Sequence, residues 1–443
     1  MKRVAVIGAG ITGLCAAHEL KRRGVTVSVF EKSARAGGLV QSAQAGGYTL
    51  ESGPNTVLAG GAIWDELIDT LGLRGRLLVA DARARKRFIA RDGRLVSVPG
   101  NPLTTPILSA GAKWRLSHEP FIRRRPADRD DESLADFARR RCGPEFLDYL
   151  VNPMVSGIYA GTPEGLSTRY AFPFLWDAEG VGGSLTAGLL RKIFAGRCVR
   201  KKMISFPNGL QELTDQLALT LGDALRLNAG VTRLRKSGGE WWLSVSGSAE
   251  WRKFDAVIET VPLHSLASAA NDGLSRARLE LFAGVPYAPV RVLQLGFDQK
   301  DVPHPLDGFG FLLPEREHQD LLGILFASSL FPSHAPAGKV LLTVMLGGMR
   351  SPSAADWPPA RALTAARAAL RQYLGVSAGP ELVHETTHPA AIPQLGLGYG
   401  EVLGELEKYE AADGDLHLAG NFRGGISVLN CIESGVRLAR GLV

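Results

Sequence analysis

The chain has 443 residues, of which 45% are hydrophobic and 21% are charged, and its formal net charge is +7. A single hydrophobic core rarely holds so many residues, so we expect two or three domains, and the ordinary composition excludes a largely disordered chain. No arginine-rich tail, zinc-ligand spacing or aromatic RNA-binding motif accompanies the positive charge, which argues against nucleic acid as a partner.

The first predicted elements form a strand–helix–strand unit at the N-terminus. Residues 4–7 are short and wholly apolar, as expected for a central strand of a parallel sheet. A helix is predicted over 11–23, and Gly24 follows it where a left-handed residue commonly ends a helix. The β-rich stretch 26–30 completes the unit, and Glu31 comes directly after it.

A GxGxxG turn lies between the first strand and the helix. It consists of Gly8, Ala9, Gly10, Ile11, Thr12 and Gly13. In such a turn the first glycine allows a tight bend, the second lets the backbone approach a pyrophosphate, and the third lets the helix pack closely on the strand. An acidic residue about 20 positions further on, here Glu31, can bind ribose hydroxyls. The combination predicts a dinucleotide site.

The residues after Glu31 extend this pattern. Glu31, Arg35, Gly37 and Gly38 form an ExxxRxGG sequence, which resembles the continuation found in FAD-binding oxidoreductases of the glutathione-reductase and amine-oxidase type. Simple NAD dehydrogenases usually lack it. The segment Glu51-Ser52-Gly53-Pro54 also matches that class, in which this stretch of backbone passes the isoalloxazine side of the cofactor.

Prolines, tryptophans and amphipathic helical stretches replace the strand–helix alternation between about residues 81 and 201. An apolar, proline-broken segment over 102–121 is followed by predicted helices at 133–141 and 143–150. The alternation returns near Gly209 with a helix over 210–220. Further strands are predicted at 224–227, 241–245, 256–258, 286–297, 339–346 and 416–419.

The last predicted strand leads into a glycine-rich segment. Leu418-Ala419-Gly420-Asn421, followed by Gly425-Ile426-Ser427-Val428, resembles the C-terminal flavin segment of the same class, where a helix N-terminus faces the pyrimidine ring. The positive end of a helix dipole favours the negative charge of reduced flavin.

Motifs in the middle of the chain narrow the resemblance. Segments 152–161 (NPMVSGIYAG), 205–210 (SFPNGL), 308–314 (GFGFLLP) and 392–394 (IPQ) are similar to segments characteristic of the protoporphyrinogen oxidase family. Generic flavin amine oxidases do not share them, and the resemblance runs from the N-terminus to the last helix. It implies an FAD cofactor and the six-electron oxidation of a porphyrinogen substrate, with molecular oxygen reoxidising the flavin.

The resemblance also implies an interwoven domain organisation. We assign residues 1–80, 203–285 and 401–443 to an FAD-binding, doubly wound α/β domain of the glutathione-reductase type. Residues 81–202 and 286–400 then form an α+β substrate domain, and 81–202 includes a helical, membrane-contacting subdomain.

The family match assigns residues to the site. Arg87 corresponds to an arginine near a substrate propionate, and no catalytic residue is assigned because flavin carries the chemistry. Further cofactor contacts fall on Lys32, Gly53, Pro54, Asn55, Thr56, Val231, His388, Gly420, Ile426, Ser427 and Val428. The chain departs from the family at Asn430, where many relatives have aspartate, and in the short stretch 188–202, so the exact substrate stays open.

Other functions remain compatible with these motifs. Coproporphyrinogen differs from protoporphyrinogen by extra propionates, and the sequence does not decide between them. An amine oxidase or a carotenoid desaturase would belong to the same superfamily, although no aromatic cage of the amine-oxidase kind can be placed. A flavin or nucleotide sensor without catalysis is the alternative from another class.

The cysteines and the apolar stretches bear on location. The four cysteines include no CxxC pair, which fits a reducing cytosol. No charge-free apolar stretch reaches the roughly 20 residues of a membrane-spanning helix. We expect a cytoplasmic protein, and the segment 102–121 beside Arg123, Arg124 and Arg125 suggests peripheral contact with the inner face of the cell membrane. A homodimer is left open.

Overall fold

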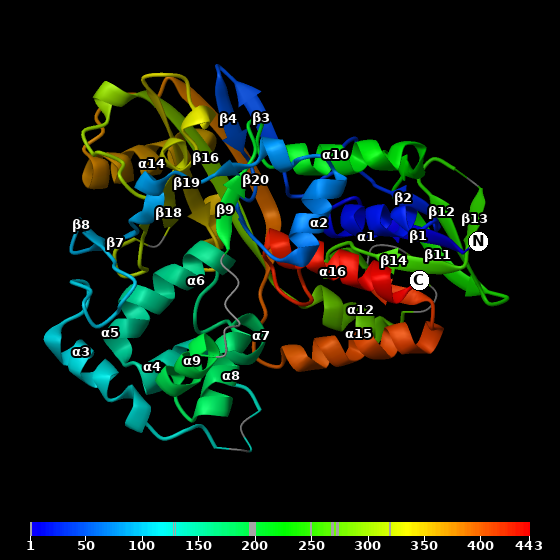
Figure 1. Cartoon of the computed structure of the whole chain (residues 1–443), viewed down its shortest axis with the longest axis horizontal. Coiled ribbons are helices and arrows are strands. Elements are labelled where there is room, and N and C mark those ends of the chain that lie inside the picture. Colours follow the sequence, from blue (N-terminus) through cyan, green and yellow to red (C-terminus); the bar gives the residue numbers. More distant parts are fainter. Residues whose placement is uncertain are drawn as a thin grey trace.

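The computed structural model describes residues 2–126, 128, 130–194, 201–248, 250–266, 270–271, 274–318 and 320–443. The described chain forms two lobes, and a group of helices lies below the second of them (Figure 1). The first lobe, on the right of Figure 1, contains both ends of the chain. The second lobe is built on a long sheet.

A five-stranded parallel sheet forms the centre of the first lobe. Its strand order is β10 (Leu225–Arg226), β2 (Thr26–Phe30), β1 (Arg3–Ile7), β14 (Ala256–Glu259) and β21 (Leu416–Leu418). One face is covered by α1 (Ile11–Arg22), α2 (Ala62–Thr70), α10 (Gln211–Leu221) and α16 (Val428–Gly441). The predicted strands 4–7 and 26–30 and the helix 11–23 are confirmed to within two residues.

The other face of the parallel sheet is also covered, which explains why residues 4–7 contain no polar side chain. Its covering elements are β11 (Val231–Ser237), β12 (Glu240–Val245), β13 (Trp251–Phe254), α11 (Leu263–Leu266), α12 (Arg276–Ala283) and α15 (Tyr399–Asp413). The short strand β15 (Ala270–Asn271) pairs with β11.

A seven-stranded sheet forms the second lobe. Its order is β20 (Leu382–Pro393), β16 (Tyr287–Asp298), β19 (Lys339–Gly347), β18 (Leu321–Phe326), β17 (Gly310–Leu312), β7 (Phe88–Arg91) and β8 (Arg94–Ser97). α14 (Pro359–Leu374) packs on one face and shares a buried core with β16, β18 and β19. The predicted strands 286–297 and 339–346 correspond to β16 and β19, whereas β20 and α14 were not predicted.

The helical region follows the β7–β8 hairpin. It comprises α3 (Ala110–Ser117), α4 (Leu134–Arg141), α5 (Pro144–Phe146), α6 (Asn152–Tyr159), α7 (Thr168–Ala171), α8 (Pro173–Gly182) and α9 (Leu185–Phe194). The helix predicted over 143–150 was wrong in form, because α5 has only one turn and a π-helix, Leu147–Val151, follows it. The π-helix has wider turns than an α-helix and ends two residues before Pro153. Proline has no backbone N–H group, so it cannot donate the hydrogen bond that a regular α-helix requires at this position.

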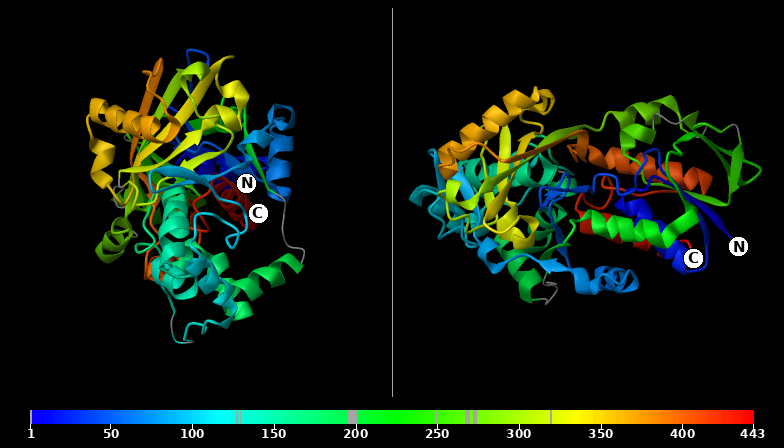
Figure 2. Two further views of the ribbon diagram at one scale, coloured as in Figure 1. Left: turned by 90° about the vertical axis from the view of Figure 1, so that its left-hand side faces the viewer. Right: turned by 90° about the horizontal axis from the view of Figure 1, so that it is seen from above.

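Small sheets connect the lobes. β3 (Ser42–Ala45) pairs with β4 (Tyr48–Glu51), and β9 (Lys202–Ser205) lies between β5 (Val57–Ala59) and β6 (Leu78–Val79). The helix α13 (Ala327–Leu330) packs on β19. Seen from above, the two lobes lie side by side, with both chain ends in one lobe (Figure 2, right). Because the parallel sheet takes strands from both ends and the middle of the chain, the polypeptide crosses between the lobes repeatedly.

Candidate functional site

The glycine turn has the geometry that the sequence predicts. Gly8 has a φ of 98°, a conformation that favours glycine. A Cβ added to Gly13 would overlap the carbonyl oxygen of Gly8, so α1 approaches the turn more closely than any other residue would allow. A Cβ added to Gly10 would meet nothing within 4 Å, which leaves this side of the turn open to a ligand.

Among the described residues, no side chain caps the N-terminus of α1. Gly10 is the N-cap residue of this helix, and no acidic residue occupies the first turn. The N–H groups of this turn therefore point their partial positive charge at the open side. A diphosphate would supply the acceptors that these groups lack.

Glu31 stabilises the turn from the end of β2. One carboxylate oxygen accepts a hydrogen bond from the N–H of Ala9 at 2.8 Å, and the other accepts one from the N–H of Ser33 at 2.9 Å. The backbone of Glu31 also pairs with the segment before β11, where the N–H of Ala229 donates to its carbonyl oxygen. A Cβ on Gly230 would lie 3.1 Å from the Cβ of Lys32, so Lys32 lies beside this segment as well. Contact of Lys32 and Val231 with the cofactor stays a prediction. Contact of Glu31 with a ribose stays a prediction.

Arg35 shapes the loop that follows. Its guanidinium donates to the carbonyl oxygens of Ala36, Gly38 and Val40 at 3.0, 2.6 and 3.3 Å. The N–H of Gly37 donates to the carbonyl oxygen of Ala9, and this bond holds the loop against the glycine turn. A Cβ on Gly38 would lie 3.1 Å from the Cα of Gly10. The ExxxRxGG sequence is therefore a set of contacts that fix the phosphate turn.

Residues Ser52, Gly53, Pro54, Asn55 and Thr56, which we call the flavin loop, follow β4. A Cβ on Gly53 would overlap the carbonyl oxygen of Leu39, so the flavin loop and the 36–40 loop are in backbone contact. Asn55 donates its side-chain amide to the carbonyl oxygen of Gly53 at 3.2 Å. His388 reaches the flavin loop from β20, with its Nε2 2.6 Å from the carbonyl oxygen of Ser52.

The C-terminal segment ends beside the glycine turn. The N–H of Ala419, next to Gly420, donates to the carbonyl oxygen of Glu259, so the segment leaves the sheet beside β14. Ser427 is the N-cap of α16, which begins at Val428, and its Oγ accepts the N–H of Asn430 at 3.1 Å.

Asn430 and Gly435 explain how α16 is placed. The side-chain amide of Asn430 donates to the carbonyl oxygen of Gly424 at 3.0 Å, a bond that the family's aspartate could not make. Gly435 lies so close to α1 that an added Cβ would overlap the carbonyl oxygen of Thr12. The two helices therefore pack backbone to backbone.

Arg87 lies just before β7 in the second lobe. It is exposed, and its guanidinium carbon lies 5.3 Å from the ring centre of Phe309. The predicted turn at Asp92 and Gly93 is confirmed, with φ angles of 52° and 72°. Lys86 differs from its neighbour because it forms an ion pair with Asp307.

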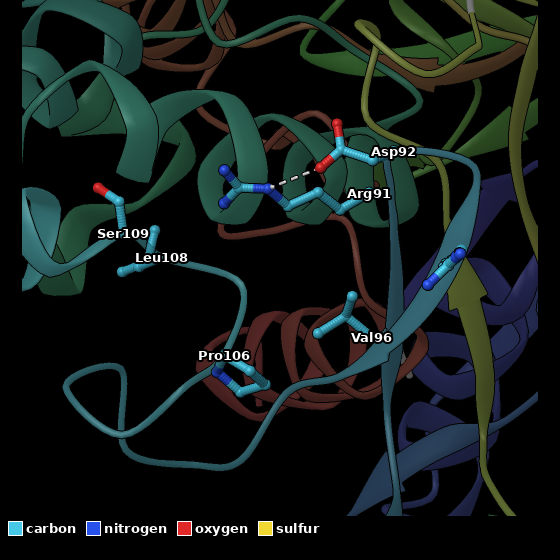
Figure 3. Close-up of a pocket in the computed structure, with 7 residues that line it drawn as sticks. Arg91, Asp92, Val96, Pro106, Leu108 and Ser109 are labelled. Atoms are coloured by element: carbon cyan, nitrogen blue, oxygen red, sulfur yellow. Dashed lines mark ion pairs between the residues drawn. The ribbon is translucent and has the colours of Figure 1, made fainter.

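A hollow at the end of the β7–β8 hairpin is lined by Arg91, Asp92, Arg94, Val96, Pro106, Leu108 and Ser109 (Figure 3). Arg91 points toward Asp92 in this view, and it also pairs with Glu145 at 2.8 Å and stacks on Tyr149. The guanidinium of Arg91 already has partners, whereas Arg94 in the same hollow is exposed.

Two buried carboxyl groups lie near the cofactor segments. Burial raises the pKa of Glu51 to about 7, although its carboxylate accepts hydrogen bonds from Ser42 and from the N–H of Leu210. Burial also raises the pKa of Glu259 to about 7, and no hydrogen bond or ion pair of this carboxyl group is found among the described residues. Sequence reasoning missed Glu259, because one acid at the end of an apolar strand gives no motif.

The described residues fit both the diphosphate part and the flavin part of FAD. The open glycine turn and the uncapped N-terminus of α1 suit the diphosphate. The flavin loop contacts strand β20 of the seven-stranded sheet. The model of the flavin containing amine oxidoreductase family matches residues 11–443. The chain belongs to this family. It is an oxidoreductase, and its cofactor is FAD.

Members and structural neighbours of the family match almost the whole chain. The chain is 35% identical to the mitochondrial protoporphyrinogen oxidase of Nicotiana tabacum, covering 99% of this chain and 94% of the relative. It is 27% identical to the coproporphyrinogen III oxidase of Bacillus subtilis, with 98% and 96% covered. A crystal structure from Exiguobacterium sp. 255-15, 22% identical, covers 100% of this chain with 98% of its own and has a TM-score of 0.83. The last similarity shows the fold.

Proposed function

We propose that the protein oxidises protoporphyrinogen IX to protoporphyrin IX, with molecular oxygen as the electron acceptor, in porphyrin and heme biosynthesis. The observation that carries the proposal is the 35% identity to a protoporphyrinogen oxidase across 99% of the chain. The family-specific segments 152–161 and 308–314 support it. They form α6 and β17, which pack against each other through Gly157 and Leu312.

The chain's own residues contribute binding and orientation to this reaction. When bound, FAD would supply the acceptor for a hydride from a methylene carbon between two pyrroles. The cation left on the substrate is delocalised, so this step requires no strong protein base. The N-terminus of α16 directs positive partial charge toward the C-terminal flavin segment. Arg87, which is exposed just before β7, would bind a propionate of the substrate.

Coproporphyrinogen III is the second candidate substrate. The relatives from Bacillus subtilis and Staphylococcus aureus named coproporphyrinogen III oxidase match 98% of the chain at 27% and 26% identity. Anaerobic mixing of the yellow holoenzyme with each porphyrinogen decides between the two. The proposal expects faster bleaching and porphyrin fluorescence with protoporphyrinogen. Bleaching with coproporphyrinogen alone would favour the second candidate, and bleaching with neither would favour a sensor.

We also propose that the helical region contacts an anionic membrane surface at the cytoplasmic side. Large apolar side chains are exposed there: Leu103, Trp114, Phe121, Phe174 and Val181. Trp114 and Phe121 are 68% and 85% exposed, and α3 buries no residue. Arg125 is engaged with Glu179 and Trp176, which leaves Arg123 and Arg124 for lipid phosphates. In the part of the chain that the structure describes, no helix has the length and apolarity to cross a bilayer.

Flotation with anionic liposomes at low salt tests the membrane proposal. The holoenzyme should float, and the double variant Trp114→Ser/Phe121→Ser should float less. Leu219→Ser, on α10 of the other lobe, removes an apolar side chain that is 73% exposed and should change nothing. A wild-type protein that stays at the bottom would defeat the proposal.

Sedimentation equilibrium of the same sample tests for the homodimer that the sequence left open.

A further inference from the structure

Two histidines of β20 hold the first residue of the flavin loop. The Nε2 atom of His388 lies 2.6 Å from the carbonyl oxygen of Ser52, and the Nε2 atom of His384 lies 3.3 Å from its Oγ. Side chains four residues apart on a strand point to the same face of the sheet. A single serine, only 4% exposed, is therefore held at its backbone and at its side chain by one strand of the other lobe.

The chemistry of the atoms fixes one of these hydrogen bonds. A carbonyl oxygen can only accept, so the Nε2 atom of His388 carries the proton and donates it to Ser52. The hydroxyl group of Ser52 can donate to His384 or accept from it. An asparagine or glutamine could replace the donor of His388, whereas an aliphatic side chain could not.

The strand before the flavin loop, β4, is also anchored to the second lobe, because the hydroxyl of Tyr48 donates to Glu381 and Leu50 packs in one cluster with Leu341. The loop itself has few described contacts with the sheet. The N–H of Ser52 donates to the carbonyl oxygen of Gln41, and Gly53 touches Leu39, but both partners belong to the first lobe's own loops. Of the contacts described for this loop, those from His384 and His388 come from the seven-stranded sheet.

The same face of the sheet carries an amide without a partner. Gln294 on β16 pairs directly with His384, so their side chains are neighbours on one face. Gln294 is 1% exposed, and neither its Oε1 nor its Nε2 has a hydrogen-bond partner among the described residues. Leaving such groups unpaired is costly, so this face suits a polar occupant beside the flavin loop.

Strand β20 also contacts the segment characteristic of the family. Just after the strand, Gln394 donates its side-chain amide to the carbonyl oxygen of Tyr159, the last residue of α6, at 2.9 Å. β20 is paired along its length with β16, and the sheet continues through β17 to β7 beside Arg87. One sheet thus joins the flavin loop, α6 and the proposed propionate residue.

We propose that His388, assisted by His384, is a positioning residue that docks the flavin loop onto the seven-stranded sheet and thereby sets the distance between flavin and substrate. The inference rests on the proposed function, since it concerns hydride transfer to flavin from a molecule on the sheet side. Transfer requires reacting atoms about 3–3.5 Å apart, and a displacement of 1 Å can cost about a hundredfold in rate.

The test compares His388→Leu, which cannot donate, with His388→Gln, which can. In the holoenzyme, His388→Leu should alter the visible circular dichroism of bound flavin and lower kcat about tenfold or more with an unchanged KM. His388→Gln should restore the spectrum and most of kcat. His118→Leu, at the exposed C-cap residue of the distant α3, should resemble the wild type.

The spectrum separates this inference from the proposed function, because it needs no substrate. If neither porphyrinogen is oxidised, an altered spectrum in His388→Leu that His388→Gln restores would still support the docking role. A wild-type spectrum in His388→Leu, or an equal defect in both His388 variants, would overturn it. Should His388→Leu fail to retain flavin, His384→Leu is compared by the same readouts, and a wild-type result there would overturn the inference.

Discussion

Arg87 and Lys86 are neighbours in the chain but have different surroundings. Lys86 is neutralised by Asp307, whereas the guanidinium of Arg87 is exposed beside the ring of Phe309 and has no carboxylate partner among the described residues. A planar guanidinium can bind a propionate with two hydrogen bonds, and such charge-assisted bonds are worth roughly 1.5–3 kcal/mol. Arg87 is therefore the better candidate for substrate binding.

Replacing Arg87 should affect substrate binding and leave the cofactor in place. We expect Arg87→Ala to raise KM about tenfold or more, since a loss of about 1.4 kcal/mol in binding is a factor of ten. Flavin content should not change. Arg85→Ala is the matched control, because Arg85 is also exposed and precedes the same strand. Lys86→Ala is a poorer control, since it leaves Asp307 unpaired. Equal, small effects in the Arg87 and Arg85 variants would place Arg87 outside the site.

Glu259 provides a prediction on pH and stability. Burial raises its pKa to about 7 in the folded protein, and the unfolded chain has the ordinary value near 4.5. Between pH 4.5 and 7 the folded state therefore binds more protons, so this group's contribution to stability falls as the pH rises through that window. Below pH 4.5 Glu259 does not lower the free energy of unfolding. Above pH 7 its ionisation lowers the free energy of unfolding by the full amount, on the order of 3 kcal/mol.

Glu259→Gln cannot ionise, so it should be more stable than the wild type at pH 8 and similar at pH 4.5. The measurement is the difference in the free energy of unfolding in urea at the two pH values. Taking a difference between variants cancels the other groups that titrate. Glu250→Gln, whose side chain is 79% exposed, should show no such dependence. A Glu259→Gln variant that loses stability at pH 8 would mean that the carboxylate has a favourable partner.

At the level of elements, the contact between α1 and α16 determines where two helix N-termini lie. Gly435→Ala should destabilise the protein by about 1–3 kcal/mol and weaken FAD binding, because the added methyl overlaps backbone of α1 and the helices must separate. Thermal unfolding and FAD titration of the apoprotein measure the two effects. Gly441→Ala is the control on the same helix, since its methyl would meet nothing within 4 Å. Similar effects from both substitutions would show that the contact between α1 and α16 can accommodate the added methyl group.

A buried ionic cluster joins helices of the helical region. Glu179 on α8 is fully buried and accepts hydrogen bonds from Arg125, Arg140 and Arg141, of which Arg141 is also fully buried. Burial alone would raise the pKa of Glu179, but hydrogen bonds from Arg140 and Arg141 outweigh it and lower the pKa to about 2. The ionised carboxylate therefore stabilises the fold at pH values above its ordinary pKa of 4.5. This contribution is lost as the pH falls toward 2.

Glu179→Gln should cost up to about 3–5 kcal/mol in unfolding free energy at pH 7, because it removes the carboxylate that the three arginines share. Among the described residues, Arg141 then keeps only Glu119 as a counter-charge, and Arg140 keeps only Glu132. Urea unfolding at pH 7 and pH 3 measures this cost, and the deficit should shrink at the lower pH. Asp136→Asn, which breaks the exposed pair with Arg139, serves as the comparison and should cost little. A cost that is equally small in both variants would mean that the cluster does not stabilise the helices.

The sequence predicted these elements unevenly. Local spacing predicts the first strand–helix–strand unit, which comprises β1, the glycine turn, α1 and β2. All the residues that define the motif, the glycines and Glu31, lie within this one unit. β20 was missed because its central residues, 384–388 (HETTH), are half-buried and polar, and they form a strand only through pairing with β16. His384 was missed with it. His388 was assigned by resemblance, but its contact with Ser52, more than 300 residues away, has no local signal.

At the scale of the whole molecule, the segments assigned to FAD come from the beginning and the end of the chain. No cysteinyl or histidyl flavin-attachment motif is evident in the sequence, so we predict that FAD is bound without a covalent bond. Heating and ultrafiltration should release all flavin into the filtrate, and the apoprotein should unfold at a lower temperature than the holoenzyme. Flavin that remains with the precipitate would refute this.

The strand order of the parallel sheet has a consequence for synthesis on the ribosome. β1 pairs with β14 about 250 residues later, and β21 at Leu416–Leu418 closes the sheet next to α16. The nascent chain therefore exposes the apolar edge of β14 until almost all of the protein has been made. Pairings of such long range fold slowly. Since an unpaired strand edge is prone to aggregation, we infer that the parallel sheet needs protection by chaperones until β21 has paired.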